Sequence, residues 1–432
     1  MSSRPGPRAM GAASGRQIAA WLSACCALLF LMVVVGGVTR LTHSGLSMTE
    51  WQPLVGAVPP LSDGQWNDIF ERYRQSPEYL KVNPGMTLAE FEGIFWWEYF
   101  HRLLGRTLGA AFLMPLLYFV ARGRIDAPLA RRLAVIFAFG ALQGALGWYM
   151  VQSGLIDDPH VSPYRLTAHL GLAFLIYAAI LRSALELLAP RPPVPDVRFR
   201  SLRLHAAALA GLIFVMVLSG GMVAGTRAGF VYNTFPLMDG RWIPDGVFSL
   251  RPWYANFLEN IPTIQFDHRL IALLLALLIP ALWFRIRRLC PARSVCHCAT
   301  LLLGALVLQV SLGIATLLHG VPVALAASHQ GGALLLFTAT LLLHHELGRL
   351  PAEPAVSGNR SRRSRKPCSA QKLNQTHVGA QAYSCWRSPS IDLTRGPAEP
   401  ASWSRPRRGR HRRARSCHKR TVWFRLSPEW LR

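Results

Sequence analysis

Long apolar runs alternate with short polar segments along the first 348 residues of the chain. Eight of these runs reach about 20 residues, the length that a helix needs to cross the hydrocarbon core of a bilayer. We expect membrane-spanning helices at about 17–38, 94–121, 132–152, 164–188, 203–225, 263–285, 298–319 and 321–345. The pattern predicts an all-α integral membrane protein.

Short motifs recur in the same order in the two halves of the chain. Gly36-Gly37 and Gly220-Gly221 lie near the ends of the first and fifth runs, and His101-Arg102 and His268-Arg269 near the beginnings of the second and sixth. Such an order indicates a parallel internal repeat. We therefore predict eight transmembrane helices arranged as two pseudo-symmetric four-helix bundles. The expected segments are a cytoplasmic N-terminus (1–16), an N-terminal half (17–190), a C-terminal half (200–348) and a basic tail (349–432).

The net charge of +25 lies mostly in the tail, which has 20 Lys/Arg against four Asp/Glu and so carries +16. Nucleic-acid binding by the membrane core is therefore not expected. The tail is too poor in apolar residues to fold alone, and we expect it to be disordered. It is either a basic arm attracted to anionic membrane lipid or sequence read in the wrong frame. The other basic residues concentrate in alternate short loops, so the positive-inside rule predicts that both termini are cytoplasmic.

Four histidines lie near the beginnings of the even-numbered runs: His101, His169, His268 and His329. An ionisable ring inside a membrane span is unfavourable and usually serves a function. Two imidazoles per half, on helices that a four-helix bundle brings face to face, suit the two axial positions of a haem iron. The alternative is that each histidine is a buried hydrogen-bonding residue, which four repeated positions make less attractive.

Charged residues beside these histidines differ between the halves. Glu98 precedes His101 by one helical turn, whereas Gln265 occupies the same offset before His268. This asymmetry indicates two unlike sites, with a carboxylate available for proton handling at the first; a plain carboxylate at the water interface is the other interpretation. Arg102 and Arg269 follow the histidines directly and suit either haem propionates or lipid headgroups. Tryptophans in the long segment 41–93 either anchor the interface or cover an apolar site.

The chain resembles the haem A synthase family, in the branch found in alpha-proteobacteria and mitochondria. The resemblance covers about residues 17–348 and rests on two long motifs, Gly36 to Met48 and Phe95 to Arg102, and on the segments around the other three histidines. It departs from Gram-positive members in lacking their loop cysteine pair, and from the family in its basic tail.

The resemblance implies a membrane-bound oxidoreductase that converts the C8 methyl of haem O to a formyl group, giving haem A for cytochrome oxidase. It implies that His268 and His329 ligate a haem b cofactor, and that His101 and His169, with Glu98, form the site of the substrate haem. The expected location is the bacterial inner membrane. Candidate partners are haem O synthase, cytochrome oxidase assembly factors and a second copy of the chain. The alternative function is a di-haem b-type membrane electron-transfer protein.

Overall fold

Eight long helices dominate the residues that the computed structural model describes, which are 12–50, 55–155, 159, 161–192, 196–289 and 291–351. They are α1 (Ala12–Leu41), α4 (Leu88–Ala121), α5 (Ala127–Gly154), α6 (Pro163–Leu188), α7 (Arg200–Gly225), α8 (Ile261–Leu289), α9 (Arg293–Leu318) and α10 (Val323–Gly348). All eight are long and apolar enough to cross a membrane, so the eight predicted spans are confirmed. The protein is an integral membrane protein.

Capping residues extend several helices beyond the apolar runs. Thr87 and Glu90 form a capping box at the beginning of α4, in which each side chain accepts a hydrogen bond from the backbone N–H of the other residue. These bonds satisfy donors that a helix N-terminus leaves unpaired. Helix α4 therefore begins at Leu88, six residues before the predicted position. The carboxylate of Asp126 caps α5 in the same manner, at 3.0 Å from the backbone N of Leu129.

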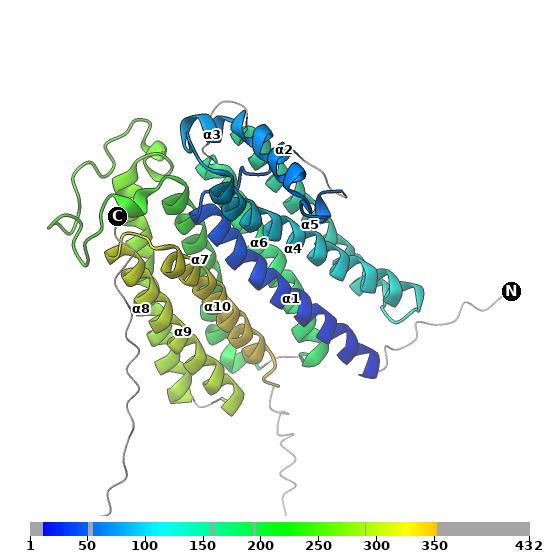
Figure 1. The fold of residues 1–432 in the computed structure, drawn as a ribbon. Helices are drawn as coiled ribbons and strands as arrows, with labels where there is room; N and C mark the ends of the chain where they lie inside the picture. Colours follow the sequence, from blue (N-terminus) through cyan, green and yellow to red (C-terminus); the bar gives the residue numbers. More distant parts are fainter. Residues whose placement is uncertain are drawn as a thin grey trace, which may run out of the picture. The chain divides into compact units, whose positions relative to one another are not determined.

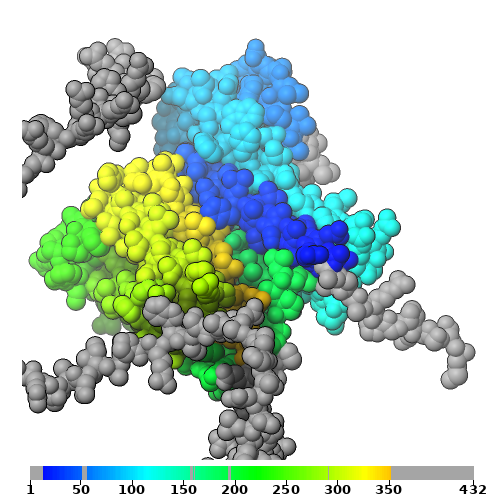
Figure 2. Space-filling view, turned by 90° about the horizontal axis from the view of Figure 1, so that it is seen from below, coloured from blue at the N-terminus to red at the C-terminus, as the bar shows by residue number. Residues whose placement is uncertain are grey.

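The eight spans form two rings of four helices. In the first ring α1 packs on α4, α4 on α5, α5 on α6, and α6 on α1; α7, α8, α9 and α10 repeat this order in the second. The rings meet where α6 packs against α7 and α1 against α10 (Figure 1). Figure 2 shows α1, in dark blue, between yellow helices of the second ring and cyan helices of the first. This arrangement is consistent with two pseudo-symmetric four-helix bundles.

The two rings share one hydrophobic core. A single cluster of buried side chains includes Leu22 and Phe174 from the first ring and Leu209 and Leu334 from the second. The described spans accordingly form one compact unit. The division into halves at 17–190 and 200–348 thus concerns the repeat in the sequence, and as a division into domains it stays a prediction.

Two short helices between α1 and α4 were not predicted. Ser62 and Ser76 cap α2 (Asp63–Arg74) and α3 (Pro77–Lys81), which lie beyond the ends of the long helices at the top of Figure 1. They pack on the beginning of α4 through a group of buried rings that we call the aromatic cap: Tyr73, Phe91, Phe95 and Tyr99. Trp66 meets the ring of Phe95 edge-on at 4.9 Å between centroids. This tryptophan therefore covers the helix ends.

The remaining predictions about the ends of the chain fall on residues that the structure does not describe. Residues 1–11 of the expected N-terminal segment and all of the tail after Pro351 lie outside the described residues. The first helix begins within the segment that was expected to precede it, at Ala12.

Candidate functional site

The four candidate histidines lie on the second and fourth helices of the two rings, all near the same end of the bundle. His169, His268 and His329 are the seventh, eighth and seventh residues of α6, α8 and α10. His101 is the fourteenth residue of α4, because α4 carries about two extra turns at that end. We call this end of the bundle the histidine end.

Each histidine ring lies against a glycine of the helix that precedes it in the ring. A methyl group on Gly36 would be 2.8 Å from Cε1 of His101, and the corresponding distance from Gly313 to Cε1 of His329 is also 2.8 Å. At the other two positions the distances are 3.1 Å for Gly147 and His169, and 3.3 Å for Gly220 and His268. All four glycines lie five to seven residues before the ends of α1, α5, α7 and α9. We call each glycine and histidine together a socket.

The sockets form two pairs. His101 and His169 lie close enough for their charges to interact, and so do His268 and His329. This is the pairing that the sequence predicts, one pair in each half. Buried nitrogens Nδ1 of His101, His169 and His329 have no hydrogen-bond partner within the described part of the chain, whereas Nδ1 of His268 lies 3.1 Å from Oγ of Ser219.

These features fit a haem with two axial imidazoles. A buried polar atom without a partner is unfavourable, so three of the four imidazoles have a ring nitrogen that a bound group could satisfy. A glycine wall leaves the ring room beside the helix backbone. Among the described residues no group of three or more His, Cys, Asp or Glu is placed to hold a bare metal ion. Two imidazoles at each site suit a metal whose other ligands come with it, as in a porphyrin.

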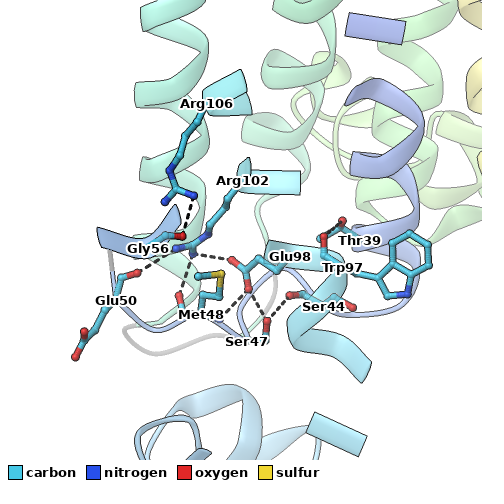
Figure 3. A network of polar contacts seen from close by, with 10 residues as sticks. All are labelled: Thr39, Ser44, Ser47, Met48, Glu50, Gly56, Trp97, Glu98, Arg102 and Arg106. Carbon is cyan, nitrogen blue, oxygen red and sulfur yellow. Dashed lines mark hydrogen bonds and ion pairs between the residues drawn. The ribbon is translucent and has the colours of Figure 1, made fainter. Parts of the chain in front are cut away.

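Glu98, one helical turn before His101 on α4, lies in a network of hydrogen-bond donors (Figure 3). Its side chain is 2% exposed. Oε2 accepts hydrogen bonds from Oγ of Ser47 at 2.7 Å and from the backbone N of Met48 at 2.8 Å, and Oε1 forms an ion pair with Arg102 at 2.6 Å. Three hydrogen-bond donors thus surround the buried carboxylate, so its setting is polar.

The second half places Gln265 in the equivalent position with different chemistry. Its side chain is 3% exposed, and Nε2 donates to the backbone O of Tyr232 at 3.1 Å. Gln265 thus binds the segment after α7, as Glu98 binds the segment after α1, but it brings no charge. The predicted asymmetry between the two sites is present in their geometry.

Arg102 and Arg269 hold the loops at the histidine end. Arg102 donates to the backbone O atoms of Met48 at 2.9 Å and Glu50 at 3.0 Å (Figure 3). Arg269 donates to the backbone O of Tyr232 at 3.0 Å, and its buried Nε has no hydrogen-bond partner within the described residues. Binding of haem propionates by these two residues stays a prediction, and the bonds to loop carbonyls are a role that the sequence did not suggest.

Two further arginines meet between the rings. Arg40, at the end of α1, donates a hydrogen bond to the backbone O of Ala224 on α7. Its guanidinium lies within electrostatic range of Arg227, the residue in the equivalent position of the second half. The repeated arginines therefore lie near each other at the histidine end.

A buried carboxyl in the loop was missed by the sequence analysis. Glu78 on α3 is 4% exposed, and its Oε2 is buried without a hydrogen-bond partner in the described residues. Burial, and after it the nearby negative charge of Glu98, raise the pKa of the Glu78 carboxyl to about 8. The residue is therefore largely protonated at pH 7. In the sequence, Pro77–Lys81 is a short polar stretch typical of a solvent-exposed loop. The burial of Glu78 becomes apparent only from the packing of α3 on the aromatic cap.

The glycines of α5 divide into two kinds. Gly140 and Gly144 have open space where a side chain would be, whereas Gly147 lies against His169.

A hydrogen bond connects the two halves through the residue that follows His329. Nε2 of Gln330 donates to the backbone O of Val33 on α1 at 2.6 Å. A methyl group on Gly37 would lie 2.7 Å from Oε1 of Gln330, so this glycine admits the amide. Helix α1, which carries Gly36, is thus bound directly to the helix of His329.

A helical membrane protein whose two pairs of buried imidazoles each suit an axially ligated iron falls in the class of integral membrane haem proteins. The chain belongs to the COX15-CtaA family of cytochrome oxidase assembly proteins, whose family model matches residues 19–341. This range contains all four sockets and Glu98.

Individual relatives match over three quarters or more of their length. The chain is 60% identical over 335 residues to a heme A synthase of Nitrosospira multiformis, covering 77% of this chain and 94% of the relative. It is 48% identical over 343 residues to a heme A synthase of Paramagnetospirillum magneticum, covering 77% and 94%. It is 44% identical over 352 residues to the heme A synthase COX15 of Arabidopsis thaliana, covering 78% and 76%. The resemblance seen in the sequence is confirmed.

Proposed function

We propose that the protein is a membrane-bound haem A synthase, an oxidoreductase that converts the C8 methyl of haem O to a formyl group. The observation that carries this conclusion is the 60% identity to a heme A synthase over 94% of that relative's length. The structure adds two paired-histidine sites of unlike chemistry, which suits a protein with one cofactor and one substrate of the same shape.

His268 and His329 hold the haem b cofactor, and His101 and His169 hold the substrate haem O. The supporting feature is the polar residue beside each pair, which is the amide Gln265 in the second half and the carboxyl residue Glu98, paired with Arg102, in the first. A bis-histidine haem b, when bound, supplies one-electron transfer. A site that only transfers electrons needs no carboxylate, whereas oxidation of a methyl group releases protons that a base must accept.

Glu98 accepts protons at Oε2. The hydroxyl of Ser47 has a single hydrogen and two acceptors in reach, Oε2 of Glu98 at 2.7 Å and the backbone O of Ser44 at 3.0 Å. Rotation of this hydroxyl towards Ser44 opens one lone pair of Oε2, while the guanidinium of Arg102 keeps Oε1 in position. The network thus orients the carboxylate and leaves one oxygen able to take up a proton.

The chain lies in the bacterial inner membrane with both termini in the cytoplasm. Arginine-rich turns support this orientation because they occur at the end opposite the histidines; they include Arg122 and Arg124 after α4 and Arg287 and Arg288 at the end of α8. Haem O synthase and cytochrome oxidase assembly factors are the protein partners, and a homo-oligomer is compatible with the lipid-facing surface.

Pigment analysis of purified variants tests the function and the assignment of the two sites together. Wild-type protein should yield haem b plus haem O or haem A by mass spectrometry. His268→Ala and His329→Ala should each remove the low-spin haem b spectrum, whereas His101→Ala and His169→Ala should keep it and abolish haem A. His319→Ala is the matched control, because this exposed histidine also lies at the histidine end and belongs to no socket.

The alternatives give different results. Haem b without haem O or haem A in the wild-type protein would identify a di-haem electron carrier. Full haem b in both His268→Ala and His329→Ala would refute the assignment of the cofactor to the second half.

A further inference from the structure

A cavity of about 360 Å³ opens at the end of the bundle opposite the histidines. It lies between the segment that joins α6 to α7, the beginning of α7 and the end of α10. Its lining residues are Arg191, Pro192, Arg200, Arg203, Leu204, Ala207, His344 and Gly348. None of the proposed catalytic or cofactor residues takes part in it.

The cavity is strongly basic, and no carboxylate is among its lining residues. His344 lies within electrostatic range of Arg182, Arg191 and Arg203. The acids in this part of the bundle already have partners: Asp196 pairs with Arg198 at 2.7 Å, Glu186 with Arg182 at 2.8 Å and Glu346 with Arg349 at 2.8 Å. The site therefore carries excess positive charge and suits an anion.

One of the donors in the cavity is buried without a partner. Nε of Arg191 is inaccessible to solvent and makes no hydrogen bond within the described residues. The guanidinium packs on Gly348, where a methyl group would lie 2.8 Å from Nε and 3.0 Å from Cζ. A desolvated guanidinium donor without an acceptor is unfavourable, and an anion bound in the cavity beside this guanidinium would stabilise its charge.

The surrounding backbone is fixed on both sides of the cavity. The ring Nε2 of His345 lies 2.9 Å from the backbone O of Ala189, where α6 ends. The backbone N of Asp196 donates to the backbone O of Leu350 at 3.0 Å. The two bonds join the segment between α6 and α7 to the end of α10. They therefore hold the backbone that carries Arg191 and Arg203 in place.

An exposed apolar track leads from the cavity along α7. Leu204 is 60% exposed, Ala207 and Ala208 are exposed, and Gly211 has open space where a side chain would be. These positions repeat every three or four residues and so lie on one face of the helix. Small side chains at this spacing leave room for a hydrocarbon chain beside a basic headgroup site.

We propose that this cavity binds the phosphate of an anionic phospholipid headgroup, with an acyl chain along the face of α7 that carries Leu204, Ala207 and Gly211. Basic pockets between spans at the cytoplasmic side are suited to such headgroups. Free inorganic phosphate would satisfy the same arginines, but it makes no use of the apolar track.

The test compares purified protein in nanodiscs of phosphatidylglycerol and of phosphatidylcholine. Native mass spectrometry reports retained lipid, and the midpoint of thermal unfolding reports binding. The wild type should retain one phosphatidylglycerol and unfold at a higher temperature in its presence. Arg191→Gln/Arg200→Gln should bind it about 30-fold more weakly, since each cation near the headgroup contributes roughly a fivefold factor. Arg288→Gln/Arg293→Gln removes two charges at the same end, outside the cavity, and should bind as the wild type does.

A steric variant keeps the proposal testable if the double substitution prevents folding. Ala207→Trp leaves every arginine in place and fills the entrance to the track, and it should lose the retained lipid. Lipid retention equal to the wild type in Arg191→Gln/Arg200→Gln or in Ala207→Trp would overturn the site. An equal thermal shift from inorganic phosphate in phosphatidylcholine discs would overturn the lipid as its ligand.

Discussion

Replacing Gly313 by alanine should release haem b from the second half. The new methyl group would lie 2.8 Å from Cε1 of His329, and ordinary contact begins at 3.4 Å. The ring must therefore move by about 0.6 Å, or α9 must move by as much. Metal ligands have to stay within about 0.5 Å of their productive positions, so we expect at least a tenfold loss of haem b per protein in the purified variant.

Two matched substitutions test whether the loss of haem b depends on how closely the added methyl group approaches a histidine ring. Gly220→Ala places its methyl group 3.3 Å from Cε1 of His268, so the ring has to move by only about 0.1 Å. This variant should therefore retain most of the haem b. Gly304→Ala lies on the same helix as Gly313 with open space around it, and alanine there should be neutral or favour the helix by up to about 1 kcal/mol. The assay is haem b per polypeptide, measured from the reduced pyridine complex. Equal haem content in Gly313→Ala and Gly304→Ala would refute the reasoning.

Three further changes probe other parts of the molecule. Glu98→Gln should keep haem b and stop haem A formation at haem O or the alcohol intermediate, which the masses of the extracted pigments would show. A wild-type level of haem A in this variant would refute the role of Glu98 as a proton acceptor. The folded Glu78 carboxyl binds its proton up to about pH 8 against 4.5 for an ordinary Glu. Stability should therefore fall as the pH rises through this window, by at most about 5 kcal/mol; Glu78→Gln should flatten the fall in thermal midpoint between pH 5 and pH 8.5, and an unchanged fall would contradict this. A chain ending after Leu350 should insert, bind haem b and make haem A like the full chain, and loss of activity with haem b retained would reveal a role for the tail.

The spans and the ligand pairs could be predicted because each leaves a local pattern. The thickness of the hydrocarbon core sets the length of an apolar run, and four histidines in repeated positions stand out against such runs. The glycine walls leave no fixed spacing, because Gly313 precedes His329 by 16 residues whereas Gly36 precedes His101 by 65. The four glycines share a position near the end of the helix that precedes each histidine, and this shared position is the signal that could have identified them.

The partners of the side chains at the loops could not be predicted from the sequence. Arg102 follows a candidate ligand, which suggested a propionate, yet the chain after α1 folds back and offers its carbonyls to this guanidinium. Glu78 appears in a short polar stretch and becomes buried only when α3 packs on the aromatic cap. Long-range packing decides both cases.

The bond between Gln330 and the backbone O of Val33 has a consequence for the order of assembly during synthesis. Helix α1 leaves the ribosome first and α10 last, yet the two pack against each other. Helix α1 also packs on α4 and α6, but its contact with the helix of His329 forms only after the final span has entered the membrane. A nascent chain with seven inserted spans lacks His329, so the second pair of sockets is complete only when the whole membrane core has been translated.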